Sequence, residues 1–175
     1  MYLGEDSFFL SETLKDYLKN KSKDNTIRIL DMGSGLGIQA ETCMKLGCKN
    51  ILAADIGKEE IQHLKKKFKA VQSNLFEKIC SKFDLIIFNP PYLPENKFDK
   101  KKDTAGGKLG DETIIKFLRQ ARLHLTKNGR ILLLLSSFTP RAGISKIIAK
   151  YYKKEKLAEK SLFFEKLEIW EISLK

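Results

Sequence analysis

The stretch "TIRILDMGSGLG", residues 26–37, decides the predicted fold. A β-branched, apolar run ends in Asp31 and is followed by Gly33, Gly35 and Gly37. Glycine lets the backbone turn sharply and lets a ligand approach it closely. The stretch therefore predicts a strand that turns tightly into a helix over "LGIQAETCMKLG", with the turn itself as a candidate ligand site.

The same alternation of apolar strands and helices continues along the chain. It predicts an α/β fold with a doubly wound, mostly parallel, seven-stranded sheet in a single domain, residues 1–175. The last two strands have no helix between them, so they should form a C-terminal antiparallel hairpin at the sheet edge. The further strands are expected at 50–56, 69–75, 83–88, 129–137, 156–164 and 167–173, and the further helices at 7–18, 58–68, 111–125 and 141–152.

Two residues are expected to mark helix ends. Gly47 follows the last residue of the helix after the glycine loop and should stop it. Asp111 precedes the helix over 111–125 and is well placed as its N-cap.

Composition limits the class of protein. Hydrophobic residues make up 42% and charged residues 31% of the 175 positions, and no apolar run is long enough to span a bilayer. The first residues, "MYLGEDSFFLSETL", carry acids where a secretory signal would be basic, so export is not expected. Cys43, Cys48 and Cys80 form no C-x-x-C pair, which favours reduced thiols in a cytoplasmic protein and gives no metal site.

The net charge of +11 allows two interpretations. A positive field raises affinity for polyanions, so nucleic acid is one candidate partner. However, the lysines fall in separate segments rather than in one stripe. We therefore favour an ordinary lysine-rich surface over a nucleic-acid partner.

Three segments place polar or glycine residues after predicted strands: the glycine loop, Asp55, and "NPPY" at 89–92. Ligands of doubly wound sheets bind at the carboxyl ends of the strands. Ile38 stands where a dinucleotide fingerprint needs glycine or alanine, and no phosphate-loop lysine follows. Asp55 lies where an acid can accept hydrogen bonds from ribose hydroxyls, so a nucleoside without a pyrophosphate is expected. A plain strand-to-helix turn is the alternative.

The segment "NPPY" predicts a site for a planar nitrogen. Pro90 and Pro91 have no N–H, so the Asn89 side-chain oxygen and the Pro90 carbonyl are acceptors with few competing donors. Such a pair can hold both hydrogens of an –NH2 group, and Tyr92 can stack on it. A structural turn that caps the strand is the alternative.

Together these residues resemble a Rossmann-like class I S-adenosyl-L-methionine-dependent methyltransferase. In order, "EDSFFLSETL", "DMGSGLG", "NLFEKI", "FDLIIFNPPYLP", "TAGGKLGDETIIKFL" and "EKLEIWEI" are similar to the glutamine methyltransferases of peptide-chain release factors, in their short archaeal and eukaryotic branch. The resemblance implies N5-methylation of the glutamine amide in the Gly-Gly-Gln motif of a release factor. The extra N-terminal helical domain of bacterial members is not expected here.

The resemblance also implies roles for single residues. Ser7 matches a hydroxyl residue near the cofactor, Asp55 the ribose acid, and Asn89 a residue that meets both cofactor and acceptor. Asn74 and Leu75 stand where the family usually has Asp-Leu beside the adenine. This departure removes a charge but keeps an acceptor oxygen, so somewhat weaker cofactor binding is expected. The first-loop cofactor residues are Asp31, Gly33, Gly35 and Gly37, and the acceptor-side residues are Asn89, Pro90, Pro91 and Tyr92.

The resemblance further implies a small zinc-binding activator protein on the sheet edge near the third strand, here about Phe68–Ser73. Lysines that already protect this edge are the alternative. The segment 105–110 is either a flap over the acceptor or a surface loop. Two other functions stay open: methylation of a nucleic-acid exocyclic amine or a protein lysine on the same scaffold, and cofactor binding without catalysis.

Overall fold

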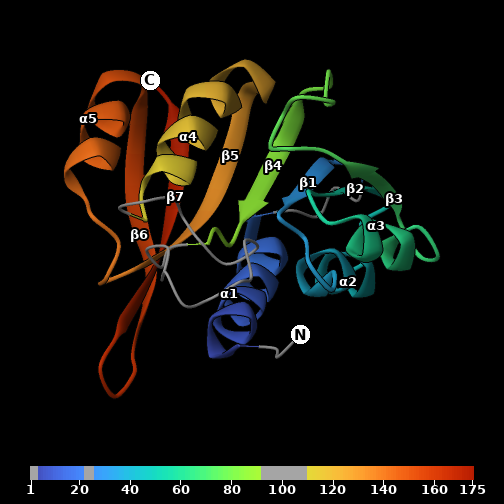
Figure 1. Cartoon of the computed structure of the whole chain (residues 1–175), viewed down its shortest axis with the longest axis horizontal. Coiled ribbons are helices and arrows are strands. Elements are labelled where there is room, and N and C mark those ends of the chain that lie inside the picture. The colour runs from blue at the N-terminus through green and yellow to red at the C-terminus, as the bar shows by residue number, and fades with distance from the viewer. Residues whose placement is uncertain (1–3, 22–25, 92–109) are drawn as a thin grey trace.

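The structure is a computed structural model that describes residues 4–21, 26–91 and 110–175. Within these residues, seven strands form one sheet in the order β3-β2-β1-β4-β5-β7-β6 (Figure 1). The first five strands are parallel and β7 pairs antiparallel with both β5 and β6. The strands are β1 Arg28–Met32, β2 Asn50–Asp55, β3 Lys69–Gln72, β4 Phe83–Phe88, β5 Leu125–Ser136, β6 Tyr152–Ser161 and β7 Lys166–Leu174. The predicted sheet class and the edge hairpin are confirmed.

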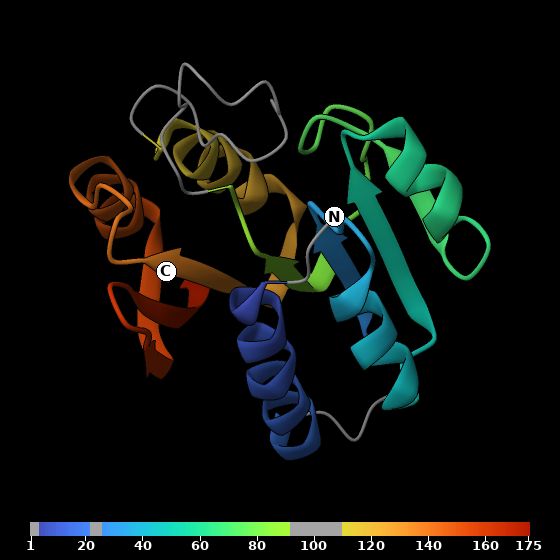
Figure 2. The same ribbon diagram turned by 60° about the horizontal axis from the view of Figure 1, so that its bottom comes forward.

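Helices cover both faces of the sheet, as Figure 2 shows for α4 and α5 on one side and α1 and α2 on the other. Alternate residues of the central strands point to opposite faces, so that Leu30 packs under α4 and α5 while Ile29 packs under α1 and α2. The described helices are α1 Glu5–Lys21, α2 Ile38–Lys45, α3 Lys58–Leu64, α4 Glu112–His124 and α5 Ala142–Tyr151. None of them is long and apolar enough to cross a membrane.

The order of the strands places the topological switch point between β1 and β4. The chain moves outward from β1 to β3 and then returns to the other side of β1 as β4. Loops after β1 and β4 therefore leave the sheet in opposite directions, which leaves a crevice position between them for a ligand. Both predicted site segments, the glycine loop and the start of "NPPY", follow these two strands.

Two strands begin earlier than the sequence predicts. β5 starts at Leu125 instead of Gly129, because Phe83 pairs with Leu125 and the chain then bulges before Leu85 pairs with Arg130. A Cβ on Gly129 would lie 2.9 Å from the Phe83 carbonyl oxygen, so glycine permits this approach. β6 starts at Tyr152, whose buried hydroxyl donates to a carbonyl of α4.

The two predicted helix ends have different outcomes. Gly47 adopts φ 88°, and the N–H groups of Gly47 and Cys48 donate to the carbonyls of Met44 and Cys43, so glycine ends α2 as predicted. Asp111 does occupy the N-cap position of α4, but its side chain makes no capping hydrogen bond. Its ψ of −10° is helical rather than extended, which turns the carboxylate away from the first free N–H groups.

Candidate functional site

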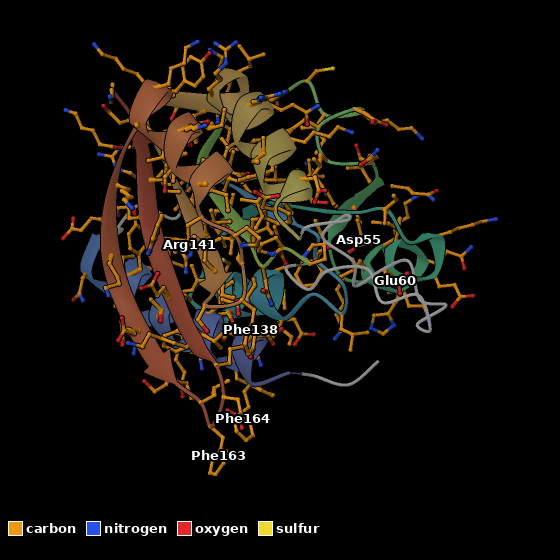
Figure 3. All side chains as sticks on the ribbon, turned by 60° about the vertical axis from the view of Figure 1, so that its left-hand side comes forward. Asp55, Glu60, Phe138, Arg141, Phe163 and Phe164 are labelled. Carbon is orange, nitrogen blue, oxygen red and sulfur yellow. The ribbon has the colours of Figure 1, made fainter. Side chains whose placement is uncertain are left out.

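The glycine loop after β1 is fixed by its neighbour β2. Gly33, Gly35 and Gly37 have φ values of 61°, 50° and 83°, a region that favours glycine. The Gly35 N–H donates to Asp55 Oδ2 at 2.8 Å, and the Gly57 N–H donates to Asp55 Oδ1 at 2.9 Å. Each carboxylate oxygen of Asp55 can still accept another hydrogen bond. Asp55 therefore sets the shape of the loop and keeps acceptor capacity at the end of β2 (Figure 3).

Asp31, the last but one residue of β1, is a buried carboxyl beside this loop. It is 2% exposed, and its Oδ2 accepts a hydrogen bond from the Ala40 N–H at 3.0 Å. Burial raises the pKa of Asp31 to about 7, against the lowering effect of the Ala40 hydrogen bond and with a further rise from the charge of Asp55. A positive group near Asp31 would favour its ionised form.

Asp31 predicts that stability falls as the pH rises. Because its folded pKa of about 7 exceeds the ordinary 3.8, the folded state keeps a proton that the unfolded chain has lost between these pH values. Between pH 6 and pH 8 we expect the free energy of unfolding to fall by about 1.4 kcal/mol, as measured by urea unfolding. Asp31→Asn should remove this loss.

Asp84→Asn is the matched control for that measurement. Although burial raises the pKa of Asp84, hydrogen bonds from Arg28 and Thr126 bring it below its ordinary value, so its charge is constant above pH 6. The wild-type loss should persist in this variant. An equal pH dependence in wild type and Asp31→Asn would contradict the assignment to Asp31.

Asn89 follows β4 and is held by the first turn of α1. Its Nδ2 donates to Asp6 Oδ2 and to Ser7 Oγ, each at 3.2 Å. Because a carboxylate only accepts hydrogen bonds, these contacts fix the orientation of the amide. The Asn89 Oδ1 is buried and accepts no hydrogen bond from the part of the chain that the structure describes. Asn89 therefore presents an oriented acceptor, which is what an –NH2 group requires.

The first turn of α1 is itself tied to α2. Asp6 Oδ1 accepts from the Ser7 N–H at 2.6 Å, and the Ser7 carbonyl accepts from Gln39 Nε2 at 2.9 Å. Gln39 is 5% exposed, so this contact is inside the protein. Asp6 and Gln39 were not predicted to be site residues. The acid directly before Ser7 was the available signal for Asp6, whereas Gln39 became visible only when α1 and α2 were placed together.

Gly33 connects the two halves of the site. A Cβ at this position would lie 3.3 Å from Phe88 Cε2 and 3.9 Å from the Asn89 carbonyl oxygen. The loop after β1 thus runs close to the end of β4, across the switch point. The structure brings Asp31, Gly33 and Asn89 together at the carboxyl ends of the neighbouring strands β1 and β4, with Asp55 one strand away at the end of β2.

Asn74 and Leu75 lie in the turn after β3. The exposed Asn74 donates from Nδ2 to Glu77 Oε1 at 2.9 Å, which leaves Oδ1 as its acceptor atom. Leu75 has a φ of 53°, and its carbonyl accepts from Ser73 Oγ at 2.8 Å. A leucine in this region costs about 1 to 2 kcal/mol, and such strain gathers at functional sites. The turn is held in a shape that an ordinary loop would not need.

Some predicted residues stay untested. Pro90 is buried and Pro91 half-buried directly after Asn89, whereas Tyr92 and the segment 105–109 lie outside the described residues. Cys43, Cys48 and Cys80 are free thiols. Across residues 4–21, 26–91 and 110–175, no three His, Cys, Asp or Glu side chains gather as a metal site would require.

Comparison with known families decides the class. The sequence model of the methyltransferase small domain family matches residues 7–164. The chain belongs to the methyltransferase small domain family. A Methanocaldococcus jannaschii protein named as a protein N5-glutamine methyltransferase is 34% identical to this methyltransferase over 94% of the chain and 86% of its own length. The release factor glutamine methyltransferase of Agrobacterium fabrum is 33% identical over half of the chain and 34% of its own length.

Solved structures show the same methyltransferase fold. The Mtq2–Trm112 complex of E. cuniculi, described as responsible for methylation of the eRF1 translation termination factor, aligns with a TM-score of 0.80 at 21% identity, over 100% of this chain and 98% of that one. The RsmC 16S rRNA methyltransferase of T. thermophilus, in complex with AdoMet and guanosine, aligns with a TM-score of 0.71 at 17% identity, over 99% and 44%.

Proposed function

We propose that this methyltransferase transfers a methyl group from S-adenosyl-L-methionine to the side-chain amide nitrogen of glutamine in the Gly-Gly-Gln motif of a peptide-chain release factor. The observation that carries the proposal is the Asn89 side chain, whose buried Oδ1 is oriented as an acceptor by Asp6 and Ser7. The names of the M. jannaschii and A. fabrum relatives support glutamine as the acceptor.

The residues at the switch point fit this cofactor. Asp31 is a buried carboxyl that favours a nearby positive group, and Asp55 keeps acceptor capacity for the hydroxyls of a ribose. Gly33 leaves a bare Cα where the two halves of the site approach. We assign Gly35, Gly37, Ser7, Asn74 and Leu75 to the same binding site, with Leu75 held in its strained turn to present the backbone. When bound, the cofactor supplies a methyl group on a sulfonium sulfur.

The protein's part in the reaction is alignment and charge stabilisation. The nitrogen lone pair of an amide is delocalised into its carbonyl, so this nitrogen is a weak nucleophile. Asn89 Oδ1 and the Pro90 carbonyl would accept its two N–H bonds, hold it in line with the methyl group and favour the positive charge that develops on it. The nitrogen would take up the methyl group that the cofactor supplies, the cofactor would leave as a neutral sulfide, and one N–H proton would leave to water.

The two prolines keep this acceptor pair free of competing donors. Neither Pro90 nor Pro91 carries an N–H, and both follow directly on Asn89 at the end of β4. We assign Tyr92 to the wall of the acceptor site. No side-chain base is needed, because the proton is lost from an acidic, alkylated nitrogen. We also propose that residues 1–175 act as one domain, and in the cytoplasm, because three free thiols suit a reducing compartment.

A second acceptor class is an exocyclic amine of a nucleic-acid base. It shares the planar –NH2 group that Asn89 and Pro90 would bind. The RsmC structure and a Serratia proteamaculans ribosomal RNA methyltransferase, 28% identical over 92% of the chain and 43% of its own length, favour this alternative. A lysine amine is neither planar nor neutral, so the same acceptors suit it less well.

We further propose a small activator protein on the β3 edge. The Mtq2 structure is a complex with Trm112, and β3 is an edge strand of four residues, Lys69–Gln72. An added strand could pair with its free backbone groups. The family resemblance leads us to expect that this partner binds zinc. Activity that rises when the partner is added would support this assignment.

The test of the proposed function offers both acceptors to one enzyme. Labelled methyl transfer from S-adenosyl-L-methionine is measured with purified release factor and with ribosomal RNA, each with and without a candidate activator. Label on the release factor that disappears when its Gly-Gly-Gln glutamine is changed to asparagine is expected. Label on RNA alone would assign the enzyme to the second class.

A further inference from the structure

The tip of the β6–β7 hairpin carries two aromatic rings that no part of the site uses. Phe163 is 94% and Phe164 83% exposed, and their ring centroids lie 4.9 Å apart in an edge-on arrangement. The preceding Leu162 packs against the core under α1 and α2. Turns are usually polar, and adjacent, almost fully exposed phenylalanines indicate a surface that becomes covered.

Hydrogen bonds hold this tip in one shape. The Leu162 N–H donates to the Glu165 carbonyl at 2.6 Å, and the Glu165 carboxylate accepts from the hydroxyl of Ser136 at the end of β5. The Ser137 N–H donates to the Lys166 carbonyl at 2.7 Å. The rings are therefore presented on an ordered support, which lowers the entropy cost of binding a partner.

The tip lies beyond the carboxyl ends of the parallel strands, at the same end of the sheet as the candidate site. Phe88, the residue before Asn89, pairs with Leu133 of β5, and Ser136 of β5 pairs with Leu167, just after the tip. Two strand spacings, about 10 Å, separate β4 from β7. In Figure 1 the β4 arrow and the hairpin tip both point toward the bottom of the view, that is, toward the same end of the sheet.

The first turn of α1 lies between the tip and the site. Lys160 Nζ, near the end of β6, is 3.5 Å from Glu5 Oε2, and the next residue, Asp6, holds Asn89. Phe138, just after the end of β5, is also near the tip: its N–H donates to Ser136 Oγ, which itself bonds Glu165 of the tip, and its ring is half exposed. Figure 3 shows Phe163 and Phe164 projecting outward at one end of the molecule, with Phe138 set back toward its body.

The charges around the tip argue against an anionic partner. Lys166 Nζ is 3.0 Å from Glu159 Oε1, and Lys156 Nζ is 2.6 Å from Glu159 Oε2. With the Lys160–Glu5 pair, these three lysines of the hairpin each face a carboxylate. Within the residues that the structure describes, these paired lysines do not form the uncompensated cationic border that attracts anionic lipid or nucleic acid.

We propose that Phe163, Phe164 and Phe138 form the docking surface for the protein that carries the acceptor glutamine. This inference rests on the proposed function. A glutamine that reaches Asn89 belongs to a folded protein. The body of that protein must therefore lie over the carboxyl ends of the parallel strands, where the tip also lies. Among the residues that the structure describes, Phe163 and Phe164 are the most exposed large apolar side chains. The aromatic tip would bind an apolar patch beside the glutamine loop, because a few buried aromatic side chains supply most of the affinity of such an interface.

The test compares an intact protein with a short peptide. The double variant Phe163→Ser, Phe164→Ser is assayed with whole release factor and with a Gly-Gly-Gln peptide too short to reach the tip. For the release factor we expect KM to rise at least tenfold with kcat unchanged, and for the peptide neither constant to change. The Kd of the enzyme for the release factor, measured without turnover, should rise by the same factor.

Leu123→Ser is the matched control. Leu123 is 58% exposed, but it lies near the end of α4, at the end of the sheet where β5 begins and opposite to the site. It should change neither KM nor Kd. Unchanged KM and Kd in the double variant, while wild type methylates the release factor, would overturn the docking surface alone. Loss of vesicle binding or of self-association as the only effect would overturn it too. A wild-type enzyme that does not methylate the release factor would contradict the proposed function, and with it this assignment.

Discussion

Replacing Asn89 with alanine is expected to lower kcat for methyl transfer by about a hundred- to a thousandfold, or about 3 to 4 kcal/mol in the barrier. The reason is the Asn89 Oδ1 atom, a buried hydrogen-bond acceptor. Asp6 and Ser7 orient it before the nitrogen that receives the methyl group arrives. A water molecule in the space left by the amide would have to be ordered during the reaction. The effect should fall on kcat more than on cofactor binding, because the positive charge on nitrogen develops only in the transition state.

Asn128→Ala is the control for this loss, since Asn128 is an exposed residue whose backbone carbonyl, not its side chain, accepts the hydrogen bond from Arg130. It should keep wild-type kcat and stability. Asn89→Asp is informative as well. It retains an acceptor oxygen but sets a second carboxylate against Asp6, so we expect it not to restore activity. Wild-type kcat in a folded Asn89→Ala protein would show that the amide takes no part in the reaction.

Gly33→Val is expected to weaken cofactor binding at least about a hundredfold, equivalent to about 3 kcal/mol. Two effects act together. A side chain at φ 61° is strained, and its Cβ would lie 3.3 Å from Phe88 Cε2, between the glycine loop and the end of β4. The branched methyl groups would then extend into the position that the cofactor needs. The Kd for S-adenosyl-L-homocysteine, measured by calorimetry, reports this directly.

Gly47 provides the matched control for Gly33. Gly47 also has a positive φ, 88°, but it ends α2 just before β2 begins, at the end of the sheet opposite to Asn89. Gly47→Val should therefore lose stability from the same backbone strain and keep its affinity for the cofactor. If Gly33→Val does not fold, Gly33→Ala keeps the comparison and should still bind at least tenfold more weakly than Gly47→Ala. Equal affinities in the two alanine variants would exclude Gly33 from the cofactor site.

Local patterns were sufficient to predict the sheet. The alternation of strand and helix, the three loop glycines and the stop at Gly47 depend on a few neighbouring residues, and the structure contains them. Boundaries failed where a distant contact decides them. β5 extends back to Leu125 because it pairs with Phe83, 42 residues earlier along the chain, and no local signal announces that pairing.

The set of residues that meet in the candidate site could be predicted only in part, for the same reason. Asn89 and Asp55 stand out because polar residues end apolar strands. Asp6 was missed because its contact with Asn89 spans 83 positions and exists only once the fold places the first turn of α1 beside the end of β4. The positive φ of Leu75 was also invisible, since leucine is not a residue that predicts such a turn. Exposure is another quantity that a pattern does not give: Phe163 and Phe164 looked like the end of a strand.

The most direct test of the central claim is the position of the methyl group in the product. Release factor is incubated with S-adenosyl-L-methionine and either wild type or Asn89→Ala, digested, and its Gly-Gly-Gln peptide sequenced by tandem mass spectrometry. We predict one added methyl group on the glutamine side chain with wild type, and a strongly reduced fraction with Asn89→Ala. A methyl group on another residue, or an equal fraction with both enzymes, would contradict the account.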